Sequence, residues 1–281
     1  MRILIHAHVY YAQIWPELAA CIRNFDTEAK IDIFLSYPSG KPEIKALLMR
    51  RFPHADMMAV DNWGYDISPF LAVINKVDLD EYDYVVKLHT KRDTPRVWCN
   101  FHVYEGNEWR RELLSFCWTP RAVQHTLNAF QWQPRLGMVT AAKMIDPTGL
   151  TGSAHHLDQV KDVVRGLGLP IRRSVVTCGT MFIVRAVLLK VLRGNFDMDT
   201  FRYAPPPGTG DGIHITVAWE CAFGMIVTSQ GYVVSAGESR LIVPFRYGAR
   251  YVTFLIMRLG SDLTRGVIRR MRQCRSHGEQ E

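Results

Sequence analysis

Polar and charged side chains gather at two places where the sequence predicts the end of a strand. The two strands are the apolar runs 57–60 and 82–88, and a three-to-four-residue apolar spacing predicts a helix over 67–74 between them. The residues near these strand ends that could do chemistry are Asn62, Asp66, His89, Thr90 and Lys91. Because ligands bind outside the carboxyl ends of strands in open α/β sheets, both groups are expected to contribute to one site. A plain helix cap is the alternative for Asp66, and a solvated basic strand end is the alternative for 89–91.

The elements that must position these side chains alternate between strand and helix. Strands are predicted over 2–9, 31–36 and 57–60, and helices over 15–25 and 41–52. Short connections of this kind make a parallel sheet with right-handed crossovers, so 1–93 is interpreted as a nucleotide-binding half. This half has no Gly-x-Gly-x-x-Gly motif and no Walker loop, which disfavours dinucleotide binding and ATP hydrolysis by a P-loop.

Residues 94–240 are interpreted as a second half that continues the same sheet. The predicted helices are 107–120, 121–130, 160–167 and 213–225, and the predicted strands are 136–141, 174–184 and 227–234. Two long loops are predicted: 146–156 is of the length that usually carries function, and 204–212 is interpreted as a mobile or clamped loop. Gly179 and Thr180 interrupt the strand 174–184 at a point where a glycine lets backbone or ligand come close.

Composition limits the classes of function. The chain has 281 residues, 48% of them hydrophobic, which is enough for a full core. Its net charge of +7 favours anionic partners. Much of this charge comes from the arginines of 240–275, a segment with a single acid, Asp262, so the positive and negative charges of the preceding residues are close to balanced. Those preceding residues are therefore not expected to bind nucleic acid. The six cysteines form no Cys-x-x-Cys pair, and the sequence predicts neither a signal peptide nor a membrane-spanning helix, so we expect a reduced cytoplasmic protein.

Six motifs occur in an order that resembles one known family. They are HAHVYY at 6–11, DNWGYDISPF at 61–70, YDYVVKLHTKRD at 82–93, EWRRELL at 108–114, LGMV at 136–139 and GTMFIVR at 179–185. Together they resemble the rhamnan synthesis protein F family, bacterial glycosyltransferase-like proteins of cell-wall and O-antigen polysaccharide assembly. The resemblance covers about residues 3 to 234, and KLHTK and GTMF are its most specific pieces.

The resemblance implies a GT-A-like glycosyltransferase fold over 1–240, with a mostly parallel central sheet flanked by helices, in which 94–240 is the acceptor-side half. It implies transfer of a sugar, such as rhamnose or another deoxyhexose, from a nucleoside diphosphate donor to a growing polysaccharide or O-antigen acceptor on a lipid carrier. The alternative is a non-catalytic sugar-nucleotide or glycan-binding scaffold of the same pathway. Such enzymes usually hold a metal on an Asp-x-Asp motif, whereas this chain has Leu88-His89-Thr90-Lys91 there. We therefore expect no cofactor, with Mg or Mn as the alternative.

The chemistry and position of individual residues indicate roles that fit this resemblance. Glu220, on an otherwise apolar helix, would have a raised pKa and act as general base toward the acceptor hydroxyl, with Asp211 as the substitute. The residues expected to bind the donor are His8, Tyr10, Asn62, Asp66, His89, Thr90, Lys91, Gly179 and Thr180. Aromatic packing for His8 and Tyr10, and a solvated or paired glutamate at 220, are the alternatives.

The C-terminal residues 241–281 are interpreted as a basic amphipathic tail with helical character. An apolar run, 251–257, is flanked by arginines and is too short to span a bilayer. It could lie in a membrane interface with its arginines on lipid phosphates, which predicts a protein peripheral to the inner face of the cell membrane. The alternative is an amphipathic helix docked on the protein's own body.

Overall fold

The computed structural model describes residues 1–26, 29–99, 102–147, 157–196, 199–202, 204 and 214–236, with the side chains of 96–99 left out. All of them belong to one compact unit, Met1–Gly237. The predicted tail, 241–281, and most of the two predicted long loops, with Asp211, lie outside the described residues. The domain boundary near 240 therefore stays a prediction.

A seven-stranded sheet forms the centre of this unit, in the order β11-β7-β10-β4-β1-β2-β3. Its strands are β1 (Arg2–His8), β2 (Lys30–Pro38), β3 (Asp56–Val60), β4 (Tyr84–His89), β7 (Leu136–Thr140), β10 (Phe182–Arg185) and β11 (Val233–Ser235). Among the described strands of this sheet, β10 alone runs antiparallel to its neighbours, which are β4 and β7. The predicted α/β class with a mostly parallel sheet is confirmed.

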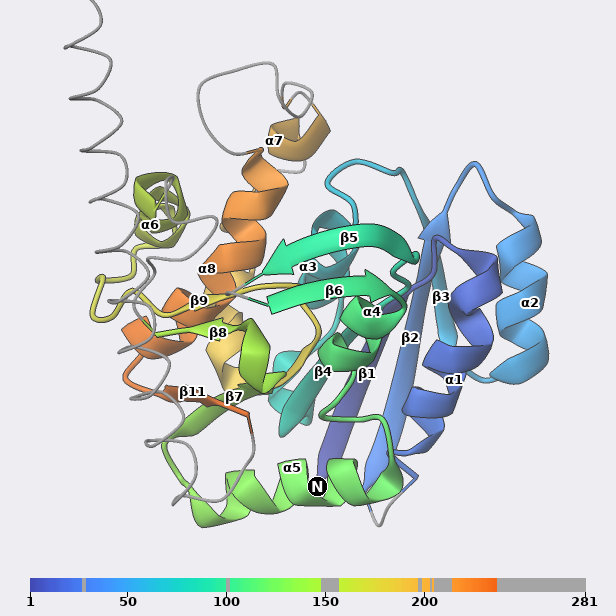
Figure 1. Cartoon of the computed structure of the whole chain (residues 1–281), viewed down its shortest axis with the longest axis horizontal. Coiled ribbons are helices and arrows are strands. Elements are labelled where there is room, and N and C mark those ends of the chain that lie inside the picture. The colour runs from blue at the N-terminus through green and yellow to red at the C-terminus, as the bar shows by residue number, and fades with distance from the viewer. Residues whose placement is uncertain are drawn as a thin grey trace, which may run out of the picture. The chain divides into compact units, whose positions relative to one another are not determined.

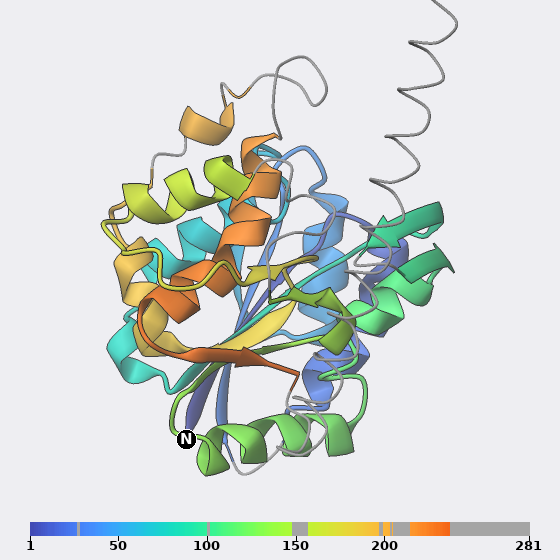
Figure 2. The same cartoon turned by 60° about the vertical axis from the view of Figure 1, so that its left-hand side comes forward.

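Helices cover both faces of the sheet (Figures 1 and 2). They are α1 (Trp15–Arg23), α2 (Glu43–Arg51), α3 (Ile67–Lys76), α4 (Glu108–Leu113), α5 (Pro120–Trp132), α6 (Leu157–Gly166), α7 (Asp199–Arg202) and α8 (Ile215–Ser229). Helices α1, α2, α4 and α5 share a hydrophobic core with one face of β1 and β4. On the other face of the sheet, α3 contacts β1, and Phe223 of α8 packs on Phe182 of β10. Helix α5 crosses the end of the sheet where the amino terminus lies, so the carboxyl ends of β1 and β4 point away from it (Figure 1).

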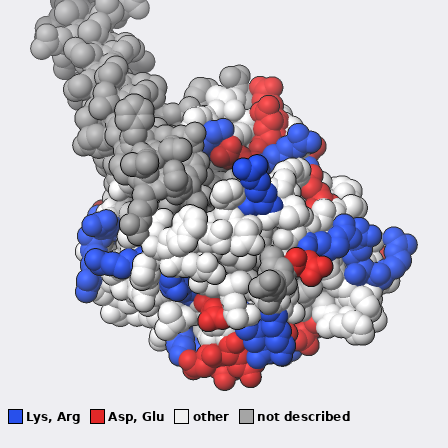
Figure 3. All heavy atoms as spheres, turned by 90° about the horizontal axis from the view of Figure 1, so that it is seen from below, with Lys and Arg blue, Asp and Glu red and all other residues white. Residues whose placement is uncertain are grey.

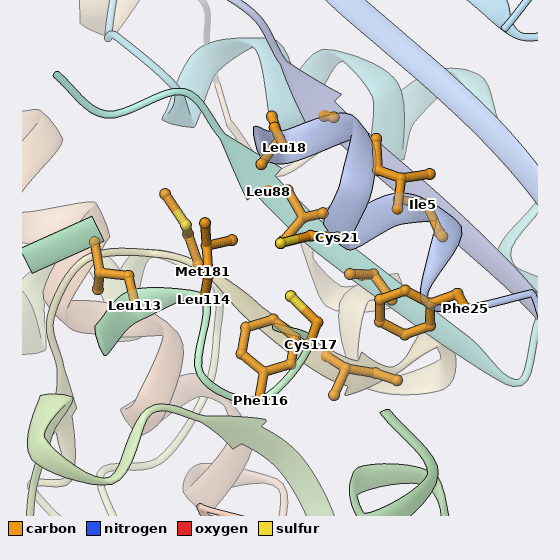
Figure 4. Close-up of a cluster of buried hydrophobic side chains, with 14 of the residues drawn as sticks. Ile5, Leu18, Cys21, Phe25, Leu88, Leu113, Leu114, Phe116, Cys117 and Met181 are labelled. Atoms are coloured by element: carbon orange, nitrogen blue, oxygen red, sulfur yellow. The ribbon is translucent and has the colours of Figure 1, made fainter. Parts of the chain in front are cut away.

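The core beneath α1 is built from side chains far apart in the sequence. Figure 4 shows Leu18, Cys21 and Phe25 meeting Ile5 and Leu88 of the sheet and a group from the segment that follows α4. All of these are at most 4% exposed, so they form part of a closely packed core. Cys21 and Cys117 are free thiols, and burial, together with the neighbouring Cys21, raises the pKa of Cys117 well above its usual value.

Strand alternation gives the opposite face of β1 and β4 a polar character. His6 and His8 of β1 alternate with core residues, as do Lys87 and His89 of β4, because successive strand residues point to opposite faces. Farther from the strand ends this face is apolar, and Phe70 of α3 packs 5.8 Å, centroid to centroid, from both Phe182 of β10 and Phe223 of α8. The polar residues are thus held in a rigid apolar frame.

Three differences between the structure and the sequence prediction concern the strands. Residues 94–106 are predicted to be irregular, but β5 (Thr94–Cys99) and β6 (His102–Gly106) pair antiparallel. The predicted strand 174–184 divides into β9 (Val176–Thr177), which pairs with β8 (Ile145–Asp146) in a separate sheet, and β10. Helix α8 continues through 227–229, where a strand was predicted, because a short apolar run does not distinguish a buried helix from a buried strand.

The surface of the described body mixes charges of both signs. On the face that Figure 3 shows, Lys and Arg side chains lie in several separate groups, and Asp and Glu side chains lie beside some of them. This agrees with the nearly balanced body that the sequence predicts. Within the described ranges, none of the helices has the length and apolar character needed to cross a bilayer.

Candidate functional site

The candidate site lies at the point where the strand order of the sheet changes direction. Strands β2 and β3 lie on one side of β1, and β4, the next strand along the chain, lies on the other side of β1. The loops that leave β1 and β4 therefore diverge and leave a crevice at the strand ends. His8 is the register partner of His89 across these two strands, and both line a cavity of about 490 Å³.

The structure brings most of the predicted site residues together in this cavity. Those that line it are His8, Tyr10, Asn62, Asp66, His89, Thr90, Lys91 and Glu220. They come from four separate parts of the chain, so only the fold makes them neighbours. Gly179 and Thr180, predicted to bind the donor, are not among the lining residues and instead hold two carboxylates in place.

Asp66 is the centre of a buried ionic cluster. Its Oδ2 accepts hydrogen bonds from Lys87 Nζ at 2.5 Å and from the Thr180 hydroxyl at 2.5 Å, and it lies 3.5 Å from His89 Nδ1. Lys87 is fully buried and also donates to the Thr180 carbonyl oxygen at 3.1 Å. Burial alone would raise the pKa of Asp66, but His89, Lys87 and the two hydrogen bonds lower it well below its usual range. The carboxylate is therefore a fixed negative charge.

This arrangement corrects one interpretation of Asp66. The residue occupies the N-cap position of α3, but its side chain makes no capping hydrogen bond. The carboxylate points to the sheet because the buried ammonium of Lys87 requires a counter-charge. The helix-cap alternative is wrong.

Three buried histidines lie beside this cluster. His6 Nε2 and His8 Nδ1 both lie within hydrogen-bonding distance of the Ser36 hydroxyl, at 2.8 and 3.0 Å. Burial lowers the pKa of His8 to about 4 and that of His89 to about 3, and it lowers the pKa of His6 as well. All three are therefore neutral at pH 7.

Two of these histidines have ring nitrogens available to a ligand. His8 Nε2 and both nitrogens of His89 form no hydrogen bond with the described residues, although both side chains line the cavity. A buried polar atom without a hydrogen-bond partner destabilises the folded protein, so a ligand that forms hydrogen bonds with these nitrogens would remove that cost. His89 and Thr90 are each only 4% exposed, which shows that the solvated alternative is wrong for them.

Glu220 is the second carboxylate of the cavity. It projects from α8, and its Oε1 accepts the backbone N–H of Gly179. Gly179 has φ of +80°, and a Cβ at this position would lie 2.1 Å from Leu113 Cδ2, so only glycine fits. Burial raises the pKa of Glu220, and nearby Lys91 partly opposes that rise. A carboxylate with a raised pKa is a stronger base than one in water.

Two further residues fix the loop that follows β4. The Thr90 hydroxyl accepts the backbone N–H groups of Tyr10 and Tyr11 at 2.9 and 3.0 Å, which ties the end of β4 to the end of β1. Arg110 of α4 is 4% exposed, pairs with Glu17 and Asp93 at 2.5 Å each, and donates to the Lys91 carbonyl oxygen at 2.9 Å. These bonds hold Lys91 and Arg92 at the cavity.

Sequence reasoning missed several residues of this site. Lys87 could have been found as a lysine in an otherwise apolar run, two residues before His89 and therefore on the same face of the strand. Trp109 lines the cavity, is 6% exposed and has an indole N–H without a hydrogen-bond partner among the described residues. Arg92 and Thr216 also line the cavity. Nothing local in the sequence marks Trp109, because its position depends on how α4 packs.

The cavity combines groups that attract an anion with one that can take a proton. Lys91 and Arg92 provide positive charge, and Glu220 provides a carboxylate of raised pKa. Among the described residues, no three His, Cys, Asp or Glu side chains converge as a set of metal ligands would. Asp93, the carboxylate nearest to Lys91 along the chain, is paired with Arg110.

Comparison with known proteins identifies related chains. A protein named WxcX and described as uncharacterized, from two strains of Xanthomonas campestris pv. campestris, is 29% identical over 254 residues. The match includes 86% of this chain but 35% of the relative, so the chain spans about a third of that protein's length. Residues 1–216 match the family described as rhamnan synthesis protein F. Since the match extends over most of the chain, the protein belongs to the rhamnan synthesis protein F family, which links it to polysaccharide synthesis.

Proposed function

We propose that this protein is a glycosyltransferase that moves a sugar, such as rhamnose or another deoxyhexose, from a nucleoside diphosphate to a growing polysaccharide. The observation that carries the proposal is the cavity at the ends of β1 and β4, in which cationic side chains and a carboxylate of raised pKa line one space. Membership of a rhamnan synthesis family supports the polysaccharide as acceptor. The GT-A-like fold assignment belongs to the same proposal and is supported by the mostly parallel sheet.

In the proposed reaction, Glu220 accepts the proton of an acceptor hydroxyl. The acceptor oxygen forms a bond to the anomeric carbon as the bond from that carbon to the diphosphate oxygen breaks. Lys91 and Arg92 neutralise the charge that develops on the departing diphosphate. His8, His89 and the Trp109 indole provide buried nitrogens that can bind the donor, and each lacks at least one hydrogen bond to the described residues.

We also propose that the diphosphate is neutralised by the chain's own cations, without Mg or Mn. The support is that Lys91 and Arg92 line the cavity and that Arg110 fixes the loop that carries them. The expected result is that transfer survives excess EDTA. Loss of activity with EDTA and its recovery with manganese would contradict this part of the proposal alone.

The test of function is release of nucleoside diphosphate when purified protein is given a panel of nucleotide sugars and a polysaccharide acceptor. We expect release with at least one donor, and Glu220→Gln should reduce its rate at least a hundredfold, because general-base catalysis contributes about 10² to 10⁴ in rate. Donor binding without turnover by the wild-type protein would instead support a non-catalytic scaffold. Thermal stabilisation by each nucleotide sugar identifies the donor independently of turnover.

We further propose that the acceptor is linked to a lipid and that residues 241–281 bind an anionic membrane surface. The support is the sequence of that segment, in which an apolar run is flanked by arginines. Co-sedimentation with anionic liposomes at low salt is expected for the full chain and not for a chain ending at 242. Equal sedimentation of both forms would contradict a membrane role for this segment.

A further inference from the structure

Two exposed aromatic side chains stand on the loop between β3 and α3, next to the cavity. Trp63 is 46% exposed and Tyr65 is 53% exposed, in a body whose large apolar side chains are mostly buried. Exposed aromatic groups beside a binding pocket commonly mark a surface that contacts a ligand. Neither the fold nor the proposed chemistry gives Trp63 a role.

The loop that carries Trp63 has a fixed shape. The Ser39 hydroxyl donates to Asp61 Oδ1 at 2.9 Å at the start of the loop. Gly64 and Tyr65 both have positive φ, +69° and +52°, and a Cβ at Gly64 would lie 2.7 Å from the ring of Phe201. Because the loop packs this closely on α7, the indole is presented by a rigid backbone.

Trp63 lines a second hollow of about 460 Å³, together with Asp61, Asn62 and Arg202. Asn62 lines both this hollow and the cavity, so the two lie next to each other. The hollow contains one carboxylate and one guanidinium, whose charges offset each other. It therefore suits a neutral ligand with many hydroxyl groups, whereas the cavity, with Lys91 and Arg92, suits an anion.

We propose that this hollow is the acceptor subsite, in which a neutral glycan lies with the apolar face of a sugar ring on Trp63. The sugar hydroxyls would meet the carboxylate of Asp61, the amide of Asn62 and the guanidinium of Arg202, which supply both acceptors and donors. A 6-deoxyhexose carries a methyl group in place of a hydroxymethyl group, which adds to the apolar surface that an indole can cover. The inference rests on the proposed function, since it names where the growing chain of that reaction is held.

The test measures binding of a glycan directly rather than turnover. A short synthetic oligorhamnoside is titrated into the full chain by calorimetry, with saturation-transfer NMR to show which sugar protons contact the protein. Trp63→Ala should raise the Kd of the oligosaccharide at least tenfold, and Trp63→Phe, which keeps an aromatic face, should stay within about threefold of wild type. Trp132→Ala is the matched control, since Trp132 is 70% exposed at the end of α5, across the opposite end of the sheet (Figure 1).

A second titration separates this inference from the function on which it rests. Uridine and thymidine diphosphate should bind wild type, Trp63→Ala and Trp132→Ala with Kd values within twofold of one another. Failure of both nucleotides to bind wild type would count against the proposed function, while the glycan titration would still decide the subsite. The subsite is overturned if wild type binds no oligosaccharide at millimolar concentration, or if Trp63→Ala binds it as wild type does.

Discussion

Lys91 is expected to contribute more than any other residue to the affinity for the anionic ligand. It lines the cavity from a loop that Arg110 holds, and its side chain is half-buried, so Lys91→Ala should leave the fold intact. We expect at least a tenfold loss of nucleoside diphosphate affinity, equivalent to about 1.4 kcal/mol. The measurement is calorimetric titration, with Lys45→Ala, an exposed lysine of α2, as control. A change of less than about threefold would remove Lys91 from the proposed site.

His89 requires a different expectation, because its side chain is buried. His89→Ala should abolish donor binding, and it should also lower stability because it leaves a cavity beside β4. A loss of binding in His89→Ala is therefore informative only when the melting temperature is measured in the same preparation.

The Lys87–Asp66 pair can be tested by a double-mutant cycle. Lys87 is fully buried and the Asp66 side chain is 18% exposed, so removing one partner leaves a buried charge without compensation. Lys87→Met and Asp66→Asn should each destabilise the fold by about 3 to 5 kcal/mol, and the double variant by less than the sum of the two. Urea unfolding measures all three. Additive losses would show that the two groups do not depend on each other.

At the scale of elements, the turn between β9 and β10 holds Glu220 through the backbone N–H of Gly179. Gly179→Ala should be strongly destabilising, because the backbone has φ of +80° and the added methyl would meet Leu113. Gly168→Ala is the matched control, with φ of +72° but nothing within 4 Å of the added methyl, so it should cost only about 1 to 2 kcal/mol. Chemical denaturation compares the two.

A rescue variant separates the steric cause from the conformational one. Leu113→Ala removes the side chain that the new methyl would meet, so the double variant with Gly179→Ala should lose less stability than the sum of the two single losses. Equal losses in Gly179→Ala and Gly168→Ala would show that the contact with Leu113 is not what requires glycine at 179.

At the scale of the whole molecule, the three buried histidines make stability depend on pH. They are neutral in the folded protein, with the pKa of His8 near 4 and that of His89 near 3, but each takes up a proton near pH 6.5 once unfolded. The unfolded state therefore binds more protons, and stability should fall as pH falls from about 6.5 toward 4. Glu220, with its raised pKa, offsets part of this loss. We expect a slope of roughly 3 to 4 kcal/mol per pH unit.

This pH dependence is measured as the free energy of urea unfolding between pH 7 and 4.5. His6 does not line the cavity, and His6→Gln keeps a group able to reach the Ser36 hydroxyl. This variant should lower the slope by the contribution of about one proton taken up on unfolding. His125→Gln, at an exposed position of α5, should leave it unchanged. An unaltered slope in His6→Gln would show that His6 does not titrate on unfolding in this range.

The sequence by itself determined the class of fold and the strand ends at which polar and charged side chains cluster. Alternation of apolar runs with helical spacing is a local property, so β1 to β4 and α1 to α3 could be predicted from it. The polar strand ends at Asp66 and at 89–91 were visible for the same reason. The pairing of β5 with β6 was not predicted, since Pro95 weakens the strand signal and the register of the pair is irregular there.

Only the tertiary structure decided how these residues combine. The pairing of His8 with His89, the burial of Lys87 against Asp66 and the bond from Gly179 to Glu220 join segments that are about 20 to 80 residues apart. The turn at Gly179 and Thr180 was visible, but its role in holding the carboxylates rather than lining the cavity was not. The physical reason is that strand order and helix packing depend on which apolar faces of the whole chain can be buried together, and no local pattern contains that information.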